Sequence, residues 1–492
     1  MTMKIFKFTK LSLFLWVTIF LPFTACSDWL DINSNPNVAN DQANIDPGYL
    51  FNYAATTHSS NRQGGDFYIP LLISGQTVAD GGFVDLGGYW SEALYDISIY
   101  STGNTWVTAY ANVGTNLNKA KEFALKNDKI NAVAQAEILQ AQAFFEMTML
   151  FGDVPFSEAM NIDEYKTPKF DTQKDVLDGI LGMLDGALEK IDLNVPGIEQ
   201  YDIFYNGEMM KWAKLARSLK LKVLMVMVDK DPTKSAAIQS LLEDESIGFI
   251  DQTSEWVFPF FEEASTENPN FRINDRYATP GEYYMFFAHN SVLDLMNPLN
   301  DPRLPVYFEK GVDGNYNGLL TSEDVEEVEG VYLTSPINYQ RVWEATAPDV
   351  MFSYSELSFL LAEVYARGLG VTQDLNKAQV YYLAGIESAL GFWQIEDPEV
   401  DAYIAQLDDI SGMTSGDALE AIYSQAWIDL MLRPFEAWVQ SRRTDFPSLT
   451  VPELAPYESL IYRWVYPDRE RNVNPNVPSP LPEITEKMWF QK

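Results

Sequence analysis

The stretch from residue 131 to residue 151 constrains the fold more than any other part of the sequence. Its small and apolar side chains recur every three or four residues, which places them on one face of a helix. They are Ala132, Ala136, Leu139, Ala143, Met147 and Leu150. The alanines let a second helix approach closely, and Gly152 and Pro155 end the helix. The sequence therefore predicts a mainly α-helical fold of closely packed helices.

Two capping boxes predict the starts of further helices. In each one, a threonine or serine is followed three residues later by an acidic residue, so that the side chains satisfy the first free N–H groups of a helix. Thr172 and Asp175 predict one such helix, and Ser353 and Glu356 predict another that ends at Gly368.

Two longer helices are expected at residues 208–228 and 418–443. The first has basic residues around its circumference, which we expect to pair with the surplus of acidic residues, although a partner-binding patch would show the same pattern. These residues are Lys211, Lys214, Arg217, Lys220 and Lys222. The second is a single helix from Ala418 to Arg443, with a kink at Pro434.

A repeat-like pattern lies in the second half of the chain. A Leu-Ala-x-x-Tyr pattern at residues 361–365 is followed by small and aromatic residues at 378–385. This is similar to the helix pair of a tetratricopeptide repeat. Alone, this pattern predicts helical hairpins, over about residues 105–228 and 353–443, more firmly than it predicts a tetratricopeptide repeat.

Residues 61–104 and 251–350 differ in composition from the helical stretches. The first segment is rich in glycine and aromatic residues, which predicts loops. The second lacks a helical period and is rich in proline, which predicts an irregular region with short strands at most. Aromatic side chains on such loops either face a ligand or anchor the loop onto the scaffold. The sequence leaves both interpretations open.

The N-terminal residues have the pattern of an export signal. Lysines precede an uncharged apolar run from Leu11 to Phe23, which is too short for a lasting membrane span. Thr24 and Ala25 then precede Cys26, the single cysteine of the chain, and this arrangement resembles the lipobox of bacterial lipoproteins. We predict a lipoprotein signal peptide over residues 1–25 and lipidation of Cys26. An ordinary cleaved signal is the alternative.

The charge of the chain excludes one class of partner. Lys and Arg number 34 against 70 Asp and Glu, which gives a formal net charge of −36. Such a surface repels phosphate backbones, so we expect no nucleic-acid partner. It also repels anionic lipid, so an acyl anchor would supply the membrane attachment that charge cannot.

Sequence motifs of common enzymes are missing. The chain has no Gly-x-Ser-x-Gly, His-Glu-x-x-His, phosphate-binding Gly-Lys-Ser/Thr or Gly-x-Gly-x-x-Gly motif. His58 and His289 are the only histidines, which disfavours histidine-based chemistry. A glycosidase needs only two carboxylates, which the many acidic residues could supply. We predict no enzymatic activity, with a surface glycoside hydrolase as the alternative.

Residues 313–324 have the spacing of an EF-hand calcium loop. Asp313, Asn315 and Asn317 place oxygen atoms at alternate positions, Gly318 follows, and Asp324 occupies the last ligand position. Glutamate is usual at that last position and reaches further, and the sequence also suits a plain hairpin loop. Calcium at Asp313, Asn315, Asn317 and Asp324 is the one cofactor that we predict as a candidate.

Several stretches carry more specific motifs. They lie at residues 26–37, 141–155, 211–219, 301–305, 356–363, 436–444 and 463–475. The most specific is Glu-Ala-Trp-Val-Gln-Ser-Arg-Arg-Thr at 436–444. In this order they resemble the SusD/RagB-like outer-membrane lipoproteins of Bacteroidetes, in the SusD-like type two branch.

The resemblance implies both a fold and a function. It implies one domain over residues 26–492, in which four tetratricopeptide-like hairpins form the scaffold and the irregular segments carry the ligand face. It also implies a location at the outer membrane, facing the cell exterior. The implied partner is a SusC-like TonB-dependent transporter, and the implied ligand is a glycan or an oligopeptide taken up as a nutrient.

Ligand residues are predicted from side-chain type within the implied ligand face, where aromatic rings would stack on the ligand and polar groups would orient it. They are Trp90, Tyr95, Asn104, Phe271, Asn274, Arg276, Tyr277 and Trp343. Trp212, Trp427 and Trp438 lie on apolar helix faces and are expected in the core. The leading hypothesis is a nutrient-binding surface lipoprotein; a structural or adhesive surface lipoprotein is a further alternative.

Overall fold

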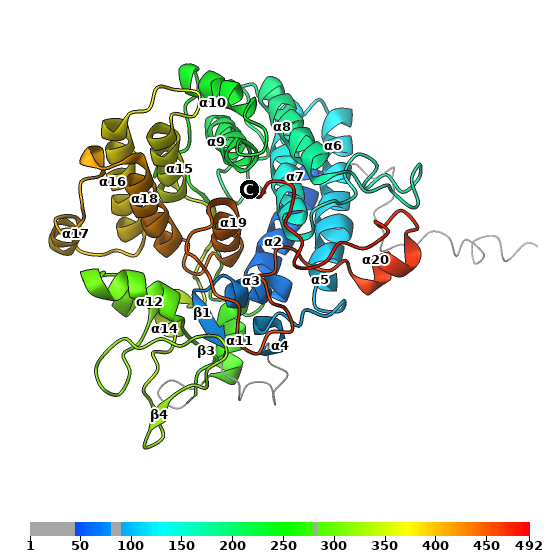
Figure 1. Ribbon diagram of the computed structural model, residues 1–492. Helices are drawn as coiled ribbons and strands as arrows, with labels where there is room; N and C mark the ends of the chain where they lie inside the picture. The colour runs from blue at the N-terminus through cyan, green and yellow to red at the C-terminus, as the bar shows by residue number, and fades with distance from the viewer. Residues whose placement is uncertain (1–44, 80–89, 279–282) are drawn as a thin grey trace, which may run out of the picture. The chain divides into compact units, whose positions relative to one another are not determined.

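The computed structural model describes residues 45–79, 90–278 and 283–492. The predicted signal peptide and Cys26 lie outside the described residues. Helices dominate, as the sequence predicts (Figure 1). None of the helices in the described part of the chain is both long and apolar enough to span a membrane.

The helices of the first half of the chain are α2 (Pro47–Arg62), α3 (Tyr68–Ile73), α4 (Trp90–Ala93), α5 (Gly103–Val107), the π-helical η3 (Thr108–Gly114), α6 (Thr115–Lys126), α7 (Ile130–Phe151), α8 (Gln173–Lys190), α9 (Met209–Met227) and α10 (Lys234–Glu243). Those of the second half are α11 (Pro269–Tyr277), α12 (Asn290–Met296), α13 (Leu304–Tyr307), α14 (Tyr339–Val342), α15 (Tyr354–Arg367), α16 (Leu375–Phe392), α17 (Asp397–Ile404), α18 (Ser415–Asp429), α19 (Pro434–Thr444) and α20 (Asp468–Val473).

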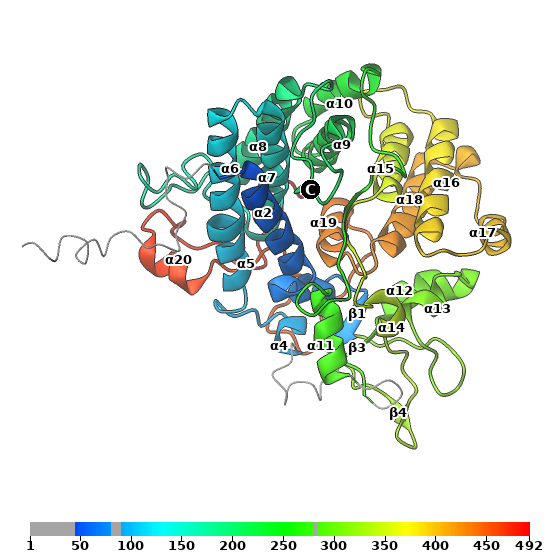
Figure 2. The same ribbon diagram turned by 180° about the vertical axis from the view of Figure 1, so that it is seen from behind.

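The long helices pack as successive hairpins. Helices α6, α7 and α8 lie side by side, α9 packs on α8, and α15 joins α9 to α16 and α18 (Figures 1 and 2). The hairpin of α15 and α16 is the predicted tetratricopeptide-like pair. Its helices approach so closely that a Cβ atom on Gly385 would lie 2.8 Å from the ring of Phe359. A small residue is therefore required at that position.

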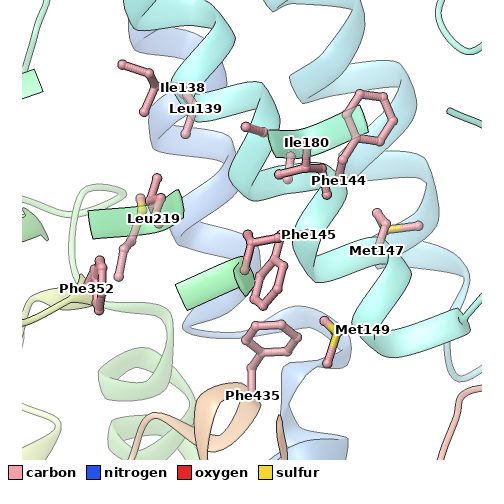
Figure 3. Packing of buried hydrophobic residues seen from close by; sticks show 14 of the residues in the cluster. Ile138, Leu139, Phe144, Phe145, Met147, Met149, Ile180, Leu219, Phe352 and Phe435 are labelled. Carbon is pink, nitrogen blue, oxygen red and sulfur yellow. The ribbon is translucent and has the colours of Figure 1, made fainter. Parts of the chain in front are cut away.

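Aromatic and aliphatic side chains fill the space between the hairpins. Phe145 of α7 points toward Phe435 of α19, with ring centroids 6.1 Å apart in an edge-to-face arrangement (Figure 3). Trp212, Trp427 and Trp438 are each at most 2% exposed. Their predicted place in the core is confirmed.

Strands in the described residues form three antiparallel pairs. They are β1 (Thr77–Ala79) with β3 (Phe286–Ala288), β2 (Trp256–Phe258) with β6 (Asp349–Phe352), and β4 (Glu327–Val328) with β5 (Val331–Tyr332). The β1–β3 pair connects the two irregular segments, which lie far apart in the sequence. These segments therefore meet on the same side of the helical scaffold.

The two helix starts predicted from capping boxes and the predicted ion pairs of α9 are confirmed. The Thr172 and Ser353 hydroxyls accept the N–H groups of Asp175 and Glu356. Each basic residue of α9 forms an ion pair with an acidic residue. The pairs are Lys211–Glu208, Lys214–Asp251, Arg217–Asp244, Lys220–Asp185 and Lys222–Glu356.

The single helix predicted from Ala418 to Arg443 was wrong. Helix α18 ends at Asp429, and α19 begins at Pro434. Between them Leu432 has a left-handed φ of 67°, which breaks the helical path. Proline at the first helical position costs no hydrogen bond, so Pro434 starts a new helix instead of kinking an old one.

The prediction of short strands at most in residues 251–350 was also wrong, because four short helices lie there: α11, α12, α13 and α14. Helix α11 shows the reason. The Asn268 side chain accepts the N–H of Asn270, and Pro269 occupies the first turn. Proline near a cap favours the start of a helix rather than its end.

A buried arginine joins four elements that lie far apart in the sequence. Arg62 of α2 donates to Glu146 of α7 at 2.5 Å, to Asp349 of β6 at 3.1 Å and to Glu436 of α19 at 3.0 Å. His58 lies 3.3 Å from Glu146. Although burial favours the neutral carboxyl, His58 and Arg62 lower the pKa of Glu146 to about 2. The Glu146 carboxylate therefore stays charged in the core at neutral pH.

We predict that Arg62→Met strongly destabilises the fold. The substitution keeps the apolar stem but leaves three buried carboxylates without their shared cation, which should lower the free energy of unfolding by about 3–5 kcal/mol. The measurement is the urea unfolding midpoint. The control is Lys126→Met, which removes an exposed pair with Glu122 and should cost less than about 1 kcal/mol. Equal midpoints for the two variants would contradict the role of Arg62.

Candidate functional site

A cavity of about 270 Å³ lies where the irregular segments meet the helices of the second half. Its lining comes from residues 341–355, which include the end of α14, from residues 388–394 at the end of α16, and from residues 429–433, which run from the end of α18 to α19. Gln63 and Glu255 complete the lining. The site therefore depends on the break between α18 and α19, because a continuous helix would not bring residues 429–433 to this wall as a loop.

Aromatic side chains form one wall of the cavity. Trp343 is 3% exposed and packs edge-on against Phe286. Trp393 is held by a hydrogen bond from its indole N–H to the Tyr307 hydroxyl at 3.2 Å. Phe392 lies edge-on to Trp393 and is 40% exposed. The wall thus combines two fixed indoles with one ring that faces solvent.

Charged and polar side chains form a second part of the lining, the polar wall. Arg433 donates to Asp429 at 2.6 Å and to Glu356 at 3.1 Å. The Ser355 hydroxyl donates to the same Asp429 oxygen at 2.8 Å. Because each of these groups is held by at least one partner, the polar wall is preorganised for a ligand.

Glu255 contributes a second carboxylate to this wall. One of its oxygens accepts the backbone N–H of Tyr354 at 2.8 Å. Burial raises the pKa of Glu255 and the Asp429 charge raises it further, while the Tyr354 N–H and Arg433 oppose the shift. The lining therefore places the carboxyl groups of Glu255 and Asp429 close to a single buried guanidinium, that of Arg433.

The polar wall is continuous with the buried charges around Arg62. Glu356 bridges Arg433 and Lys222, whose ammonium lies 2.7 Å from a Glu356 oxygen. Lys222 is 3.9 Å from Glu436, which in turn accepts from Arg62. Cavity and core therefore share one network of charges.

Of the predicted ligand residues whose side chains the structure describes, Trp343 lines this cavity and the others do not. Asn274 is buried and donates to the Asn270 carbonyl of its own helix. Asn104 is exposed and donates to Asp66 at 3.0 Å. Phe271 is half-buried and Arg276 exposed, both on α11.

Three further predictions concern Tyr95, Trp90 and Tyr277. Tyr95 is 4% exposed, burial raises the pKa of its hydroxyl, and it lines a smaller hollow of about 100 Å³ beside Arg442. The side chains of Trp90 and Tyr277 lie outside the described residues. The predicted ligand residues thus do not gather in one place, and ligand contact by any of them stays a prediction.

The predicted calcium loop forms an exposed turn. The Asp313 carboxylate accepts hydrogen bonds from N–H groups of Asn315 and Asn317 at 2.9–3.0 Å. These hydrogen bonds lower the pKa of Asp313, and the one from the Asn315 backbone N–H has the largest effect. Asp324 is exposed. Extended backbone flanks the turn, since Leu319 bridges to His289, whereas an EF-hand has helices there. Calcium binding stays a prediction.

Sequence reasoning missed most of the cavity. Phe392 and Trp393 end a scaffold helix, and Asp429 and Arg433 lie in the interior of the helix that was predicted as continuous. One signal was available in the sequence: two aromatic residues, Phe392 and Trp393, directly follow Gly391 near the end of the helix. Glu255 has no comparable signal, because its place is fixed by pairing of β2 with β6.

Comparison with known families gives one match over most of the chain. The SusD-like_2 model, described as starch-binding and associating with the outer membrane, matches residues 77–467. No protein of the curated set matches the chain by sequence.

Solved structures with similar folds extend over nearly the same range. A SusD homologue from Bacteroides uniformis is 21% identical, with a TM-score of 0.76 over 91% of this chain and 100% of that chain. A chitin-binding protein is 21% identical, with a TM-score of 0.75 over 90% of this chain and 99% of that chain. A SusD homologue from Parabacteroides distasonis is 20% identical, with a TM-score of 0.74 over 91% and 98%. At these identities the likeness shows the fold alone.

Proposed function

Since the chain belongs to the SusD-like_2 family of starch-binding proteins that associate with the outer membrane, we propose that it is a nutrient-binding protein of the cell surface. In this proposal it binds a glycan or an oligopeptide without hydrolysing it and delivers the ligand to a SusC-like TonB-dependent transporter. The family membership itself was predicted from the sequence motifs and is confirmed.

The observation that carries the proposal is the cavity between α14, α16 and the α18–α19 connection. Sugar rings and peptide groups both offer flat faces that stack on aromatic side chains, while polar groups fix their orientation. The Trp393 indole and the Phe392 ring supply such faces, and the Arg433 and Asp429 side chains supply fixed polar groups. Phe392 and Arg341 are exposed at the rim, so a longer chain can extend into solvent.

Delivery to a transporter requires that the protein stay at the membrane. The net charge of −36 opposes association with anionic lipid, so attachment needs another source of free energy. Acyl chains on Cys26 would supply it, because two or more chains anchor a protein stably. The lipobox-like sequence before Cys26 supports this part of the proposal.

We predict that Phe392→Ala weakens oligosaccharide binding. Removing an exposed stacking ring should cost about 1–2 kcal/mol, which is about 5- to 30-fold in Kd. Calorimetric titration with maltoheptaose and with a hexamer of N-acetylglucosamine measures the effect for each oligomer that binds. Val380→Ala is the matched control, because Val380 is a 66% exposed apolar residue of the same helix. Unchanged binding in the Phe392 variant would contradict the assigned cavity.

We also predict that Cys26→Ser releases the protein from the membrane. The serine hydroxyl cannot carry the thioether-linked lipid, so the variant should appear in soluble fractions, whereas the wild type should co-purify with a TonB-dependent transporter after gentle detergent extraction. Mass spectrometry of the wild-type N-terminus should find an acylated cysteine. A free thiol, together with a soluble wild type and no transporter, would contradict the proposal and favour a different surface or secreted role.

A further inference from the structure

We propose that Glu255 makes the cavity selective for ligands that carry a protonated amino group. This inference rests on the proposed function, because it assigns a chemical preference to the same cavity. The ligands that this proposal describes share one feature, a primary ammonium group next to the flat face of a sugar ring or a peptide group. An amino sugar with a free amine and a peptide with a free amine both provide it.

The position of Glu255 gives its carboxylate an unused acceptor. One oxygen is fixed by the backbone N–H of Tyr354 at 2.8 Å. For the second oxygen, no hydrogen bond or ion pair is found among the described residues, and Glu255 lines the cavity. A carboxylate that is partly desolvated and held at one oxygen is an efficient acceptor for a cationic donor, because the geometry is already set.

The basic residues that line the cavity already have partners within the protein. Arg433 forms ion pairs with Asp429 at 2.6 Å and with Glu356 at 3.1 Å. Arg341 lies at the exposed rim and donates to the Trp393 carbonyl at 3.1 Å. The described lining contains Glu255, Glu344 and Asp429 against these two arginines, while Glu356 behind Arg433 is paired with Lys222 as well. The site therefore carries excess negative charge, which a ligand cation would balance.

The aromatic wall favours the same class of ligand. An ammonium near the face of an indole or phenyl ring is attracted by the ring quadrupole, and Trp343, Trp393 and Phe392 all line the cavity. An anionic ligand would meet the unbalanced carboxylates and be repelled. Acetylation of the amine removes the charge and keeps the sugar ring, so it isolates the contribution of Glu255.

The experiment compares matched ligands on the full-length protein in detergent. Calorimetric titrations at pH 7 use a glucosamine tetramer and an N-acetylglucosamine tetramer as one pair. A tetrapeptide with a free amine and its N-acetylated form are the second pair. We expect the amine form of at least one pair to bind about tenfold more tightly than its acetylated form; the pair that shows the preference identifies the source of the amine.

The test variant is Glu255→Gln, which keeps an oxygen for the Tyr354 N–H and removes the charge. It should abolish the preference while leaving binding of the acetylated ligand within about twofold. Glu189→Gln, which removes an exposed carboxylate on α8, should leave the preference intact. In the wild type, the preference should disappear as the pH falls and the Glu255 carboxyl is protonated. Because burial raises the pKa of Glu255, this loss should begin at a higher pH than for an exposed glutamate.

Two failures are distinguishable. If amine and acetylated ligands bind equally, and Phe392→Ala weakens both, the cavity binds nutrients as proposed but the role of Glu255 is wrong. If the preference survives Glu255→Gln, the role of Glu255 is also wrong. If no member of either pair binds but maltoheptaose does, the cavity binds nutrients as proposed and the role of Glu255 is wrong; if maltoheptaose does not bind either, the proposed function of the cavity fails and the inference fails with it.

Discussion

The rest of the structure depends on one constraint, the three buried ion pairs of Arg62 with Glu146, Asp349 and Glu436. Buried charges are stable only when their partners are held at hydrogen-bonding distance, so these ion pairs fix α2, α7, β6 and α19 relative to one another. The same charges continue through Lys222 to the polar wall of the cavity. Scaffold stability and site geometry therefore arise from one network, although the residues that form it are scattered over the sequence.

Local signals predicted the scaffold well because each depends on residues that are close in the chain. The alanine stripe of α7 and the caps at Thr172 and Ser353 act within one or a few helical turns. The break between α18 and α19 depends instead on a left-handed residue at Leu432, which a helical sequence pattern does not reveal. The helices among residues 251–350 were missed because proline starts a helix as readily as it ends one.

The site was predicted less well than the fold, since side-chain type identifies a candidate but not its neighbours. Trp343 lies in the lining of the cavity, whereas the side chain of Asn274, also predicted as a ligand residue, donates to the Asn270 carbonyl of its own helix. Phe392 and Trp393 were not predicted as site residues because they lie at the end of a helix that was assigned to the scaffold. Glu255 reaches the cavity only through strand pairing between distant segments, which no local pattern encodes.

The central claim is that ligand binds in the cavity between α14, α16 and the α18–α19 connection. Hydrogen–deuterium exchange with and without a saturating oligosaccharide tests it most directly. The account predicts slower exchange in residues 341–348 and 388–394 when ligand is bound, and no change in residues 297–316, which line a separate hollow beside α17. Slower exchange at 297–316 with no change around the cavity would contradict it.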